Sequence, residues 1–218
     1  MTANLPFPLL TAAAQLASCH GWSEEVYSDL LAVQDGSLSQ DAFDRKYLRR
    51  KGILSLDLTG HTAQAPRQRP LHALLRIFDA QKVCIPALRE HGASAVRCAD
   101  DDLIALFDEP AQAVEAAFEV HRRLGIFNHS GLPGESPPLA CIGIGIGDVY
   151  TIGPNLAMGD EVNRAAKLGE DLARGNETLV TANVYFALRH RPDLAFEQLS
   201  NDDQMFPYYR ASFSGHGR

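Results

Sequence analysis

The sequence predicts an α/β sandwich in which helices cover a mainly antiparallel sheet. From Ile53 to the C-terminus, apolar runs typical of strands alternate with segments whose apolar residues recur at helical spacing. The chain has 218 residues, of which 45% are hydrophobic and 22% are charged. These values exclude a chain that is disordered throughout and favour one domain with an extension.

The first part of the chain predicts a helical N-terminal extension. Short helices are expected over residues 9–19 and 23–33, followed by a polar turn and a charged helix that ends at residues 49–52. The segment carries no recognisable catalytic pattern, which favours a packing or dimerisation arm. We therefore divide the chain into an extension, residues 1–50, and a second domain, residues 51–218.

The second domain begins with the apolar strand 53–56, which leads into Asp57. A long helix is predicted from Pro70 to His91, with a kink at Pro86 and an apolar stripe formed by Leu71, Leu74, Leu75, Phe78, Ile85 and Leu88. Two short strands, 93–97 and 103–107, flank an acidic turn. The remaining elements are a helix over 110–124, a strand over 139–150, a helix from 160, a strand over 178–181, a helix over 182–189 and terminal strands near Phe196 and Tyr208.

The charge balance limits the choice of partners. Twenty Lys and Arg residues against 27 Asp and Glu residues give a formal net charge of −7, without a basic run that could follow a phosphate backbone. Nucleic acid is therefore not expected as a partner. A nucleotide is compatible with this charge if local cations or a bound metal offset the negative field.

Neither the cysteines nor the histidines show the spacing of a metal site. Cys19, Cys84, Cys98 and Cys141 are far apart, so we expect buried free thiols, and the eight histidines are expected on the surface or in the core. The apolar stretch 5–17 contains two prolines, follows no basic region and is too short to span a bilayer. These features predict a soluble protein of a reducing cytoplasm, without a membrane partner.

Acidic residues at two strand ends are the candidates for chemistry. Asp57 follows an apolar strand, and the triplet Asp100–Asp102 precedes another. Carboxylates at such positions are costly unless a cation neutralises them, and two carboxylates with few other ligands suit magnesium that also binds substrate phosphates. The alternative is that Asp57 caps a turn and the triplet is a solvated hairpin tip, which residue spacing alone favours.

Four blocks of sequence follow one another in the second domain, at residues 54–62, 97–107, 145–149 and 159–168. In this order they resemble the catalytic domain of class III adenylate/guanylate cyclases. Residues 54–62 (LSLDLTGHT) resemble the first metal-binding strand of that family, with His61 in place of its usual Phe. Residues 97–107 (RCADDDLIALF) resemble the family's acidic hairpin. Residues 145–149 and 159–168 (GDEVNRAAKL) resemble its next strand and its Asn-bearing helix. Together the blocks span roughly residues 52–213, which is far more specific than any one motif.

The resemblance implies a ferredoxin-like βαββαβ cyclase fold of the α/β (α+β) class. It also implies an enzyme that converts a nucleoside triphosphate, ATP by base rate, into a 3′,5′-cyclic nucleotide and pyrophosphate. Two Mg²⁺ or Mn²⁺ ions would be held by Asp57, Asp101 and the backbone carbonyl of Leu58. The positions that would contact the nucleotide are Leu58, Thr59, Gly60, His61, Thr62, Arg97 and Leu156.

The same resemblance implies a homodimer. In this family the Asn-bearing helix serves the partner subunit's site, so Asn163 would orient the ribose and Lys167 would stabilise the phosphoryl transition state across the interface. Lys167 lies one helical turn after Asn163 and therefore on the same face. A symmetric head-to-tail pair of chains would make two shared sites.

Several positions depart from the family pattern. Lys167 stands where the family has Arg. Lysine keeps the positive charge but lacks the planar guanidinium, which can donate to two phosphate oxygens at once. Arg97 and Leu156 replace the Lys and Asp that select adenine, and residues 200–204 contain no basic residue for phosphate. Alternatively, Arg97 is an exposed residue paired with Asp100 or Asp102, and Leu156 simply packs. These positions therefore do not decide which nucleobase the protein would use.

Two functions from different classes remain. The first is an active nucleotidyl cyclase. The second is a catalytically weak, cyclase-like domain that binds nucleotide or a partner protein as a regulator, with residues 1–50 as a possible contact for an unknown regulatory partner. The alternating Gly143, Gly145 and Gly147 lack dinucleotide-loop spacing and indicate close packing or ligand approach instead.

Overall fold

The computed structural model describes residues 9–18, 21–59, 70–129, 138–152, 157–200 and 206–214. The chain divides into two compact units. The N-terminal unit consists of Met1–Arg49 and Tyr150–Met158, and the main unit consists of Arg50–Val149 and Gly159–Arg218.

The N-terminal unit has three helices and a short hairpin. The helices are α1 (Ala13–Ala17), α2 (Glu24–Asp35) and α3 (Gln40–Tyr47), and β5 (Ala157–Met158) pairs with the end of β4. Ser23 and Ser39 cap α2 and α3 by accepting backbone N–H groups with their hydroxyls. A small core forms from Val26, Phe43, Tyr47 and Ile152.

The charged helix is shorter than the sequence predicted. It ends at Tyr47, and the residues that were expected to continue it belong to strand β1 (Leu48–Leu58). The guanidinium of Arg49 donates to the carbonyls of Arg45 and Lys46, so it caps the helix after the backbone has already become extended. The charge pattern that predicted a longer helix therefore extended over residues 48–52, which belong to β1, including Arg49, which caps α3.

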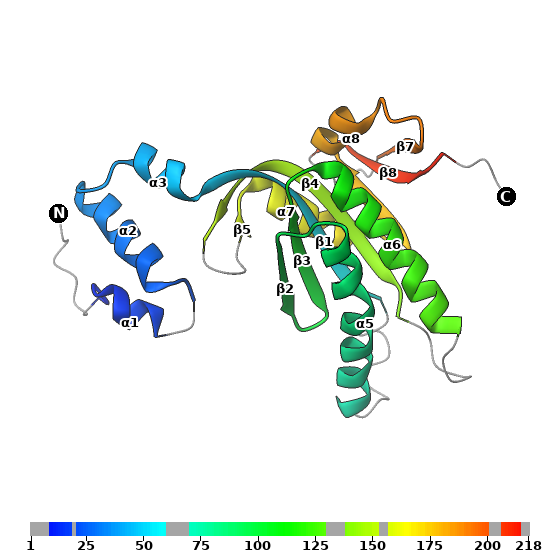
Figure 1. Cartoon of the computed structure of the whole chain (residues 1–218), viewed down its shortest axis with the longest axis horizontal. Helices are drawn as coiled ribbons and strands as arrows, with labels where there is room; N and C mark the ends of the chain where they lie inside the picture. Colours follow the sequence, from blue (N-terminus) through cyan, green and yellow to red (C-terminus); the bar gives the residue numbers. More distant parts are fainter. Residues whose placement is uncertain are drawn as a thin grey trace. The chain divides into compact units, whose positions relative to one another are not determined.

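The main unit is built on a β-α-β-β-α-β order (Figure 1). After β1 come α5 (Pro70–Glu90), β2 (Ala95–Ala99), β3 (Asp102–Phe107), α6 (Pro110–His129) and β4 (Ala140–Thr151). These strands lie in the order β2-β3-β1-β4, which is the ferredoxin-like arrangement that the sequence predicted. The mixed α/β fold class is therefore confirmed.

The second half of the main unit extends the sheet. It contains α7 (Asp160–Lys167), the π-helix η1 (Leu168–Leu172), β6 (Glu177–Thr181), α8 (Ala182–Leu188), β7 (Leu194–Leu199) and β8 (Tyr208–Phe213). The eight-stranded sheet has the order β2-β3-β1-β4-β6-β8-β7, with β5 paired to β4. Among the pairs of described register only β4 and β6 are parallel. The π-helix was not predicted.

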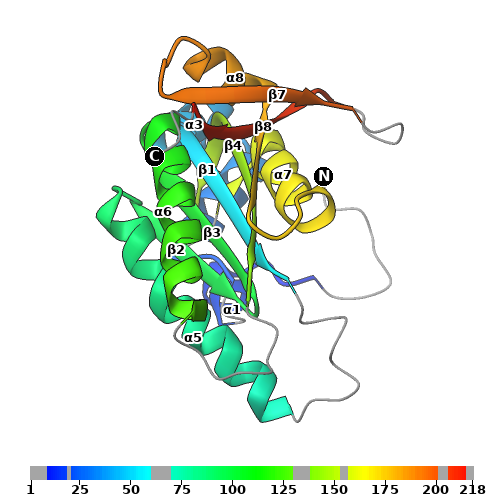
Figure 2. The same cartoon turned by 90° about the vertical axis from the view of Figure 1, so that its right-hand side faces the viewer.

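The two faces of the sheet carry different helices. Figure 2 shows α5 and α6 on one side of β1, β3 and β4, and α7 on the other. The α5/α6 face holds the main core, to which β1 contributes Leu54 and Leu56 and β4 contributes Ile142 and Ile144. Because side chains alternate along a strand, Ser55 and Asp57 of β1 belong to the α7 face.

Helix α5 packs through only part of its apolar stripe. It continues through Pro86 to Glu90, and its second half buries Ala80, Cys84 and Leu88 in the core. The first half leaves its large apolar side chains 47–61% exposed: Leu71, Leu74, Leu75 and Phe78. Helical spacing correctly predicted the helix but not where the sheet beneath it ends.

Candidate metal and nucleotide site

Three aspartates meet where β1 ends and the β2–β3 hairpin turns. Strands β1 and β3 are antiparallel with Leu56 opposite Leu103, and one further step of this register sets Asp57 opposite Asp102. One carboxylate oxygen from each of Asp57, Asp101 and Asp102 lies within 4.8 Å of the others. The sequence offered Asp57 and the triplet Asp100–Asp102 as candidates, and the family resemblance narrowed the triplet to Asp101. The strand register adds Asp102 to the cluster.

The cluster concentrates negative charge. Burial, then the charges of Asp101 and Asp102, raise the pKa of Asp57 to about 6. Burial and the neighbouring aspartates also raise the pKa of Asp102. Glu170 of η1 has a pKa raised by burial and by the charge of Asp102. The carboxylates therefore repel one another in the absence of a cation.

This donor set fits a divalent metal ion. All three side chains are half-buried, offer only oxygen, and form no ion pair with a described residue. Hard cations such as Mg²⁺ and Mn²⁺ prefer carboxylate oxygens and take the rest of their shell from water or phosphate. The cluster could hold such an ion.

The chain after Asp57 is described only at its start. The side chain of Leu58 is 2% exposed and belongs to the core, which leaves its backbone as the group available to a ligand. The backbone N–H of Thr59 donates to the carbonyl of Leu139 at 2.8 Å. The other predicted nucleotide contacts lie outside the described residues: Gly60, His61, Thr62 and Leu156.

Arg97 shares a sheet face with the acidic cluster. It pairs with Ile104, which in turn pairs with Ser55, so the three residues form one row across β2, β3 and β1. Asp57 follows Ser55 by two residues and Asp102 precedes Ile104 by two, so both point to the same side as this row. The Arg97 side chain is exposed and makes no ion pair with a described residue, so the alternative pairing with Asp100 or Asp102 does not form.

Asn163 and Lys167 project from the outer surface of α7. Both are exposed, and neither side chain bonds to a described residue. Ala165 and Leu168 are fully buried on the opposite side of the helix. The predicted pair thus shares one accessible face, and both residues are free to contact another molecule.

The glycines of β4 explain how α7 can lie so close to the sheet. A Cβ atom on Gly143 would overlap the carbonyl oxygen of Ala165, and one on Gly145 would lie 2.8 Å from the carbonyl oxygen of Glu161. At Gly169 a Cβ would lie 2.9 Å from the carbonyl oxygen of Ser55. Of the two interpretations of the glycine alternation, close packing is therefore the one observed.

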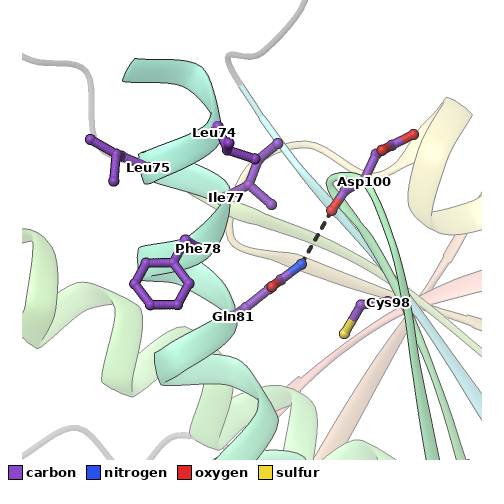
Figure 3. A pocket seen from close by; sticks show the side chains of 7 residues that line it. All are labelled: Leu74, Leu75, Ile77, Phe78, Gln81, Cys98 and Asp100. Carbon is purple, nitrogen blue, oxygen red and sulfur yellow. Dashed lines mark hydrogen bonds between the residues drawn. The ribbon is translucent and has the colours of Figure 1, made fainter. Parts of the chain in front are cut away.

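A shallow apolar groove lies on the other face, between α5 and the hairpin tip (Figure 3). Leu74 and Phe78 line it from the helix, and Gln81 donates to the backbone carbonyl of Asp100 at 3.3 Å. Cys98 also lines it and is exposed, so the prediction of buried thiols is wrong for this residue. Its position on an outer strand is the reason. Cys84 and Cys141 are buried free thiols as expected.

The fold has well-defined relatives among solved structures. An adenylate/guanylate cyclase/hydrolase from Silicibacter pomeroyi matches with a TM-score of 0.64 and 22% identity over 75% of this chain and 95% of that one. The guanylate cyclase domain of RhGC from Catenaria anguillulae, in complex with GTP, matches at 0.61 with 15% identity over 75% and 96%. A non-canonical dimeric guanylyl cyclase domain of the RhoGC fusion protein from Blastocladiella emersonii matches at 0.61 with 14% identity over 76% and 96%.

These matches establish the fold: the main unit has the architecture of adenylate and guanylate cyclase catalytic domains, as the sequence blocks indicated. No family model and no curated protein sequence matches the chain. Among the described residues, no helix combines the length and apolar character needed to cross a membrane.

Proposed function

We propose that the chain is a nucleotidyl cyclase, a phosphorus–oxygen lyase that forms a 3′,5′-cyclic nucleotide and pyrophosphate from a nucleoside triphosphate. The observation that carries the proposal is the cluster of Asp57, Asp101 and Asp102 at the strand ends of a cyclase fold. Such an enzyme produces a second messenger and acts where nucleoside triphosphates are made, in the cytoplasm.

The acidic cluster is the proposed metal centre. Asp57, Asp101 and the Leu58 carbonyl would hold two Mg²⁺ or Mn²⁺ ions, and Asp102 adds a third carboxylate at the same place. Bound divalent cations supply positive charge to the triphosphate and lower the pKa of the attacking 3′-hydroxyl. The carboxylates fix where that charge sits, and their mutual repulsion favours cation binding.

The nucleotide would lie along the α7 face of the sheet. Residues 59–62, which follow Asp57, are proposed to contact the phosphates. Arg97 lies on the same face as Asp57 and is proposed to contact the nucleobase. Leu156 is the other proposed nucleobase contact. A guanidinium only donates hydrogen bonds, so it selects a base edge that presents acceptors. ATP remains the base-rate expectation, with a base pocket that is atypical for an adenylate cyclase.

A second copy of the chain would complete each site. Asn163 and Lys167 are exposed and free of described partners, which suits residues that act on a neighbouring chain. In this assignment Asn163 orients the ribose and Lys167 neutralises charge on the phosphoryl group in the transition state. A head-to-tail homodimer would then have two shared sites. The dimeric state of one cyclase domain of the same fold supports a dimer, though not this particular arrangement of its chains.

A regulatory cyclase-like domain is the second candidate. It is favoured by Lys167 in place of the family's Arg and by the lack of a basic residue in 200–204. We assign residues 1–50 as a helical extension to the catalytic domain 51–218 and propose it as the contact for a regulatory partner. This candidate predicts nucleotide binding with little or no turnover.

The deciding experiment measures turnover of the purified protein with ATP, GTP, CTP and UTP separately, with Mg²⁺ or Mn²⁺. Cyclic products are resolved by chromatography, and Asp57→Ala is measured beside the wild type. A cyclic product that disappears in Asp57→Ala supports the cyclase and identifies its base. A folded dimer that binds nucleotide without forming any cyclic product supports the regulatory candidate instead.

A further inference from the structure

Glu161, near the start of α7, has an unusual environment for a carboxylate. The residue is 6% exposed and lies between the helix and the sheet. One oxygen accepts from the backbone N–H of Ile146 at 3.2 Å and from the Thr181 hydroxyl at 2.8 Å. The other accepts from the Asn183 amide at 3.1 Å and from the Arg164 guanidinium at 2.7 Å. Every partner is a donor.

These four donors come from four different elements. Ile146 belongs to β4, Thr181 ends β6, Asn183 belongs to α8, and Arg164 is one turn further along α7. A single carboxylate therefore joins the first turn of α7 to the strands below it and to the neighbouring helix. Burying a charge is costly unless it is fully hydrogen-bonded, and here both oxygens have two donors each.

The sheet provides room for this side chain. A Cβ atom on Gly145 would lie 3.0 Å from a carboxylate oxygen of Glu161, and a Cβ atom on Gly147 would lie 2.6 Å from its Cγ. Both glycines thus leave space that the Glu161 side chain occupies. We call this arrangement the anchor of α7: the Glu161 carboxylate with its four donors, together with Gly145 and Gly147 of β4, which leave room for it.

The anchor also sets the rotation of the helix. Asn163 follows Glu161 by two residues and Lys167 by six, which at 100° per residue places them about 200° and 240° around the axis. The anchored residue and the two exposed ones therefore lie on roughly opposite sides of α7. Rolling the helix would carry Asn163 and Lys167 away from their outward positions.

We infer that Glu161 is a positioning residue, which holds α7 in the rotation that presents Asn163 and Lys167 to the site of the partner chain. The inference rests on the proposed cyclase function. A residue that acts only on stability would change the unfolding free energy and leave the rate of the folded enzyme unchanged. A positioning residue changes kcat, because displacing an oriented group costs rate even when the fold persists.

The test replaces Glu161 by Gln, which keeps the shape but turns an acceptor oxygen into an NH₂ that faces two donors. We expect kcat to fall by about 10- to 100-fold. KM and the thermal shift produced by Mn²⁺ stay unchanged because the metal ligands are on β1 and the hairpin. Hydrogen exchange of the α7 amides rises. Asp160→Asn, the adjacent exposed carboxylate, is the matched control and leaves all four quantities unchanged.

A second variant separates positioning from general damage. Asn183→Asp in the Glu161→Gln background returns a carboxylate to the cluster, which can accept from the new amide and from Arg164. We expect this double variant to recover most of kcat and to restore slow exchange in α7. Recovery by exchanging donor and acceptor indicates that the hydrogen-bonded geometry, rather than the identity of residue 161, sets the rate.

Mixed dimers test where Glu161 acts. Chains with Asp57→Ala lack a metal ligand but keep α7 intact, whereas chains with Glu161→Gln keep the metal ligands. In a heterodimer of the two variants, one site combines the intact metal ligands of the Glu161→Gln chain with the intact α7 of the Asp57→Ala chain. This site should be active. A folded Glu161→Gln protein with unchanged kcat and unchanged α7 exchange would overturn the inference while leaving the cyclase proposal intact. A wild type without cyclic product contradicts the proposed function, and hydrogen exchange then still decides whether Glu161 anchors α7.

Discussion

The two faces of the central sheet pack against their helices through different kinds of contact. On the α5/α6 face, leucine, isoleucine and alanine side chains fill a continuous apolar core. On the α7 face, glycines let a short helix approach the strands, and a hydrogen-bonded carboxylate holds it there. The acidic cluster and Arg97 also belong to this second face.

Glu161 on the α7 face and His121 on the α5/α6 face show the same contrast in how a titratable side chain is hydrogen-bonded. Glu161 on the α7 face has four hydrogen-bond donors around it. His121 of α6 has a single partner, the hydroxyl of Thr178 at 2.9 Å. Polar groups are therefore concentrated where geometry has to be specified, and are rare where apolar burial provides the stability.

The largest effect is expected on the α7 face, from Asp101→Asn. Loss of one carboxylate removes both charge and a ligand oxygen from the metal centre, so turnover should fall by about 10²- to 10³-fold or more. The fold should persist, since the side chain packs nothing in the core. Asp100→Asn is the control on the same hairpin: Asp100 has φ of 52°, which Asn tolerates, and it is not part of the cluster. Equal losses in both variants would contradict the assignment of Asp101.

The opposite result is expected on the α5/α6 face, from Leu56→Ala. Leu56 is fully buried, and truncating it should lower the unfolding free energy by about 2–5 kcal/mol with kcat of the folded fraction unchanged. Leu74→Ala is the control on α5, where the side chain is 61% exposed; it should change stability by less than about 0.5 kcal/mol. Urea unfolding at constant pH measures both. A strong effect of Leu74→Ala would mean that its apolar face is covered in solution.

The sequence predicted much of this contrast but not its details. Apolar periodicity and the acidic turn predicted the β-α-β-β-α-β order, whereas the pairing of Asp57 with Asp101 rested on the family resemblance, since residue spacing alone favoured a turn cap and a solvated hairpin tip. The burial of Glu161 was not predictable, because a glutamate in a first helical turn is ordinarily solvated and three of its four donors come from other elements of the chain. The π-helix, the third aspartate and the exposed half of α5 likewise depend on strand register and on where the sheet ends.

A smaller effect on stability, with an effect on rate as well, is expected from Gly143→Ala. The added methyl group would overlap Ala165 and the backbone N–H of Gly169, so α7 must shift; we expect a loss of about 1–3 kcal/mol together with a lower kcat. Gly125→Ala is the control, because nothing lies near that position of α6, and Ala in a helix interior should stabilise by about 1 kcal/mol. If Gly143→Ala kept full stability and full turnover, close packing of α7 would not be required.

At neutral pH the smallest effect is expected from His121, whose contribution appears only in acid. Burial lowers the pKa of His121 to about 4 from its ordinary 6.5. Its Nε2 shares a hydrogen bond with the Thr178 hydroxyl, and its Nδ1 has no hydrogen-bond partner among the described residues. Because the unfolded chain binds a proton below pH 6.5 and the folded chain does not, this group's contribution is complete above pH 6.5 and is lost as the pH falls toward 4.

The matched variants are His121→Gln and His129→Gln, both on α6. In urea unfolding between pH 4.5 and 8, the wild type and His129→Gln should lose stability below pH 6.5, whereas His121→Gln should lose less over the same range, since Gln does not titrate. His129 is exposed, so His129→Gln controls for the general effect of removing a histidine from α6. Identical pH profiles for all three proteins would mean that the α5/α6 face accommodates a charged imidazole, and the contrast between the two faces would then not extend to their buried titratable groups.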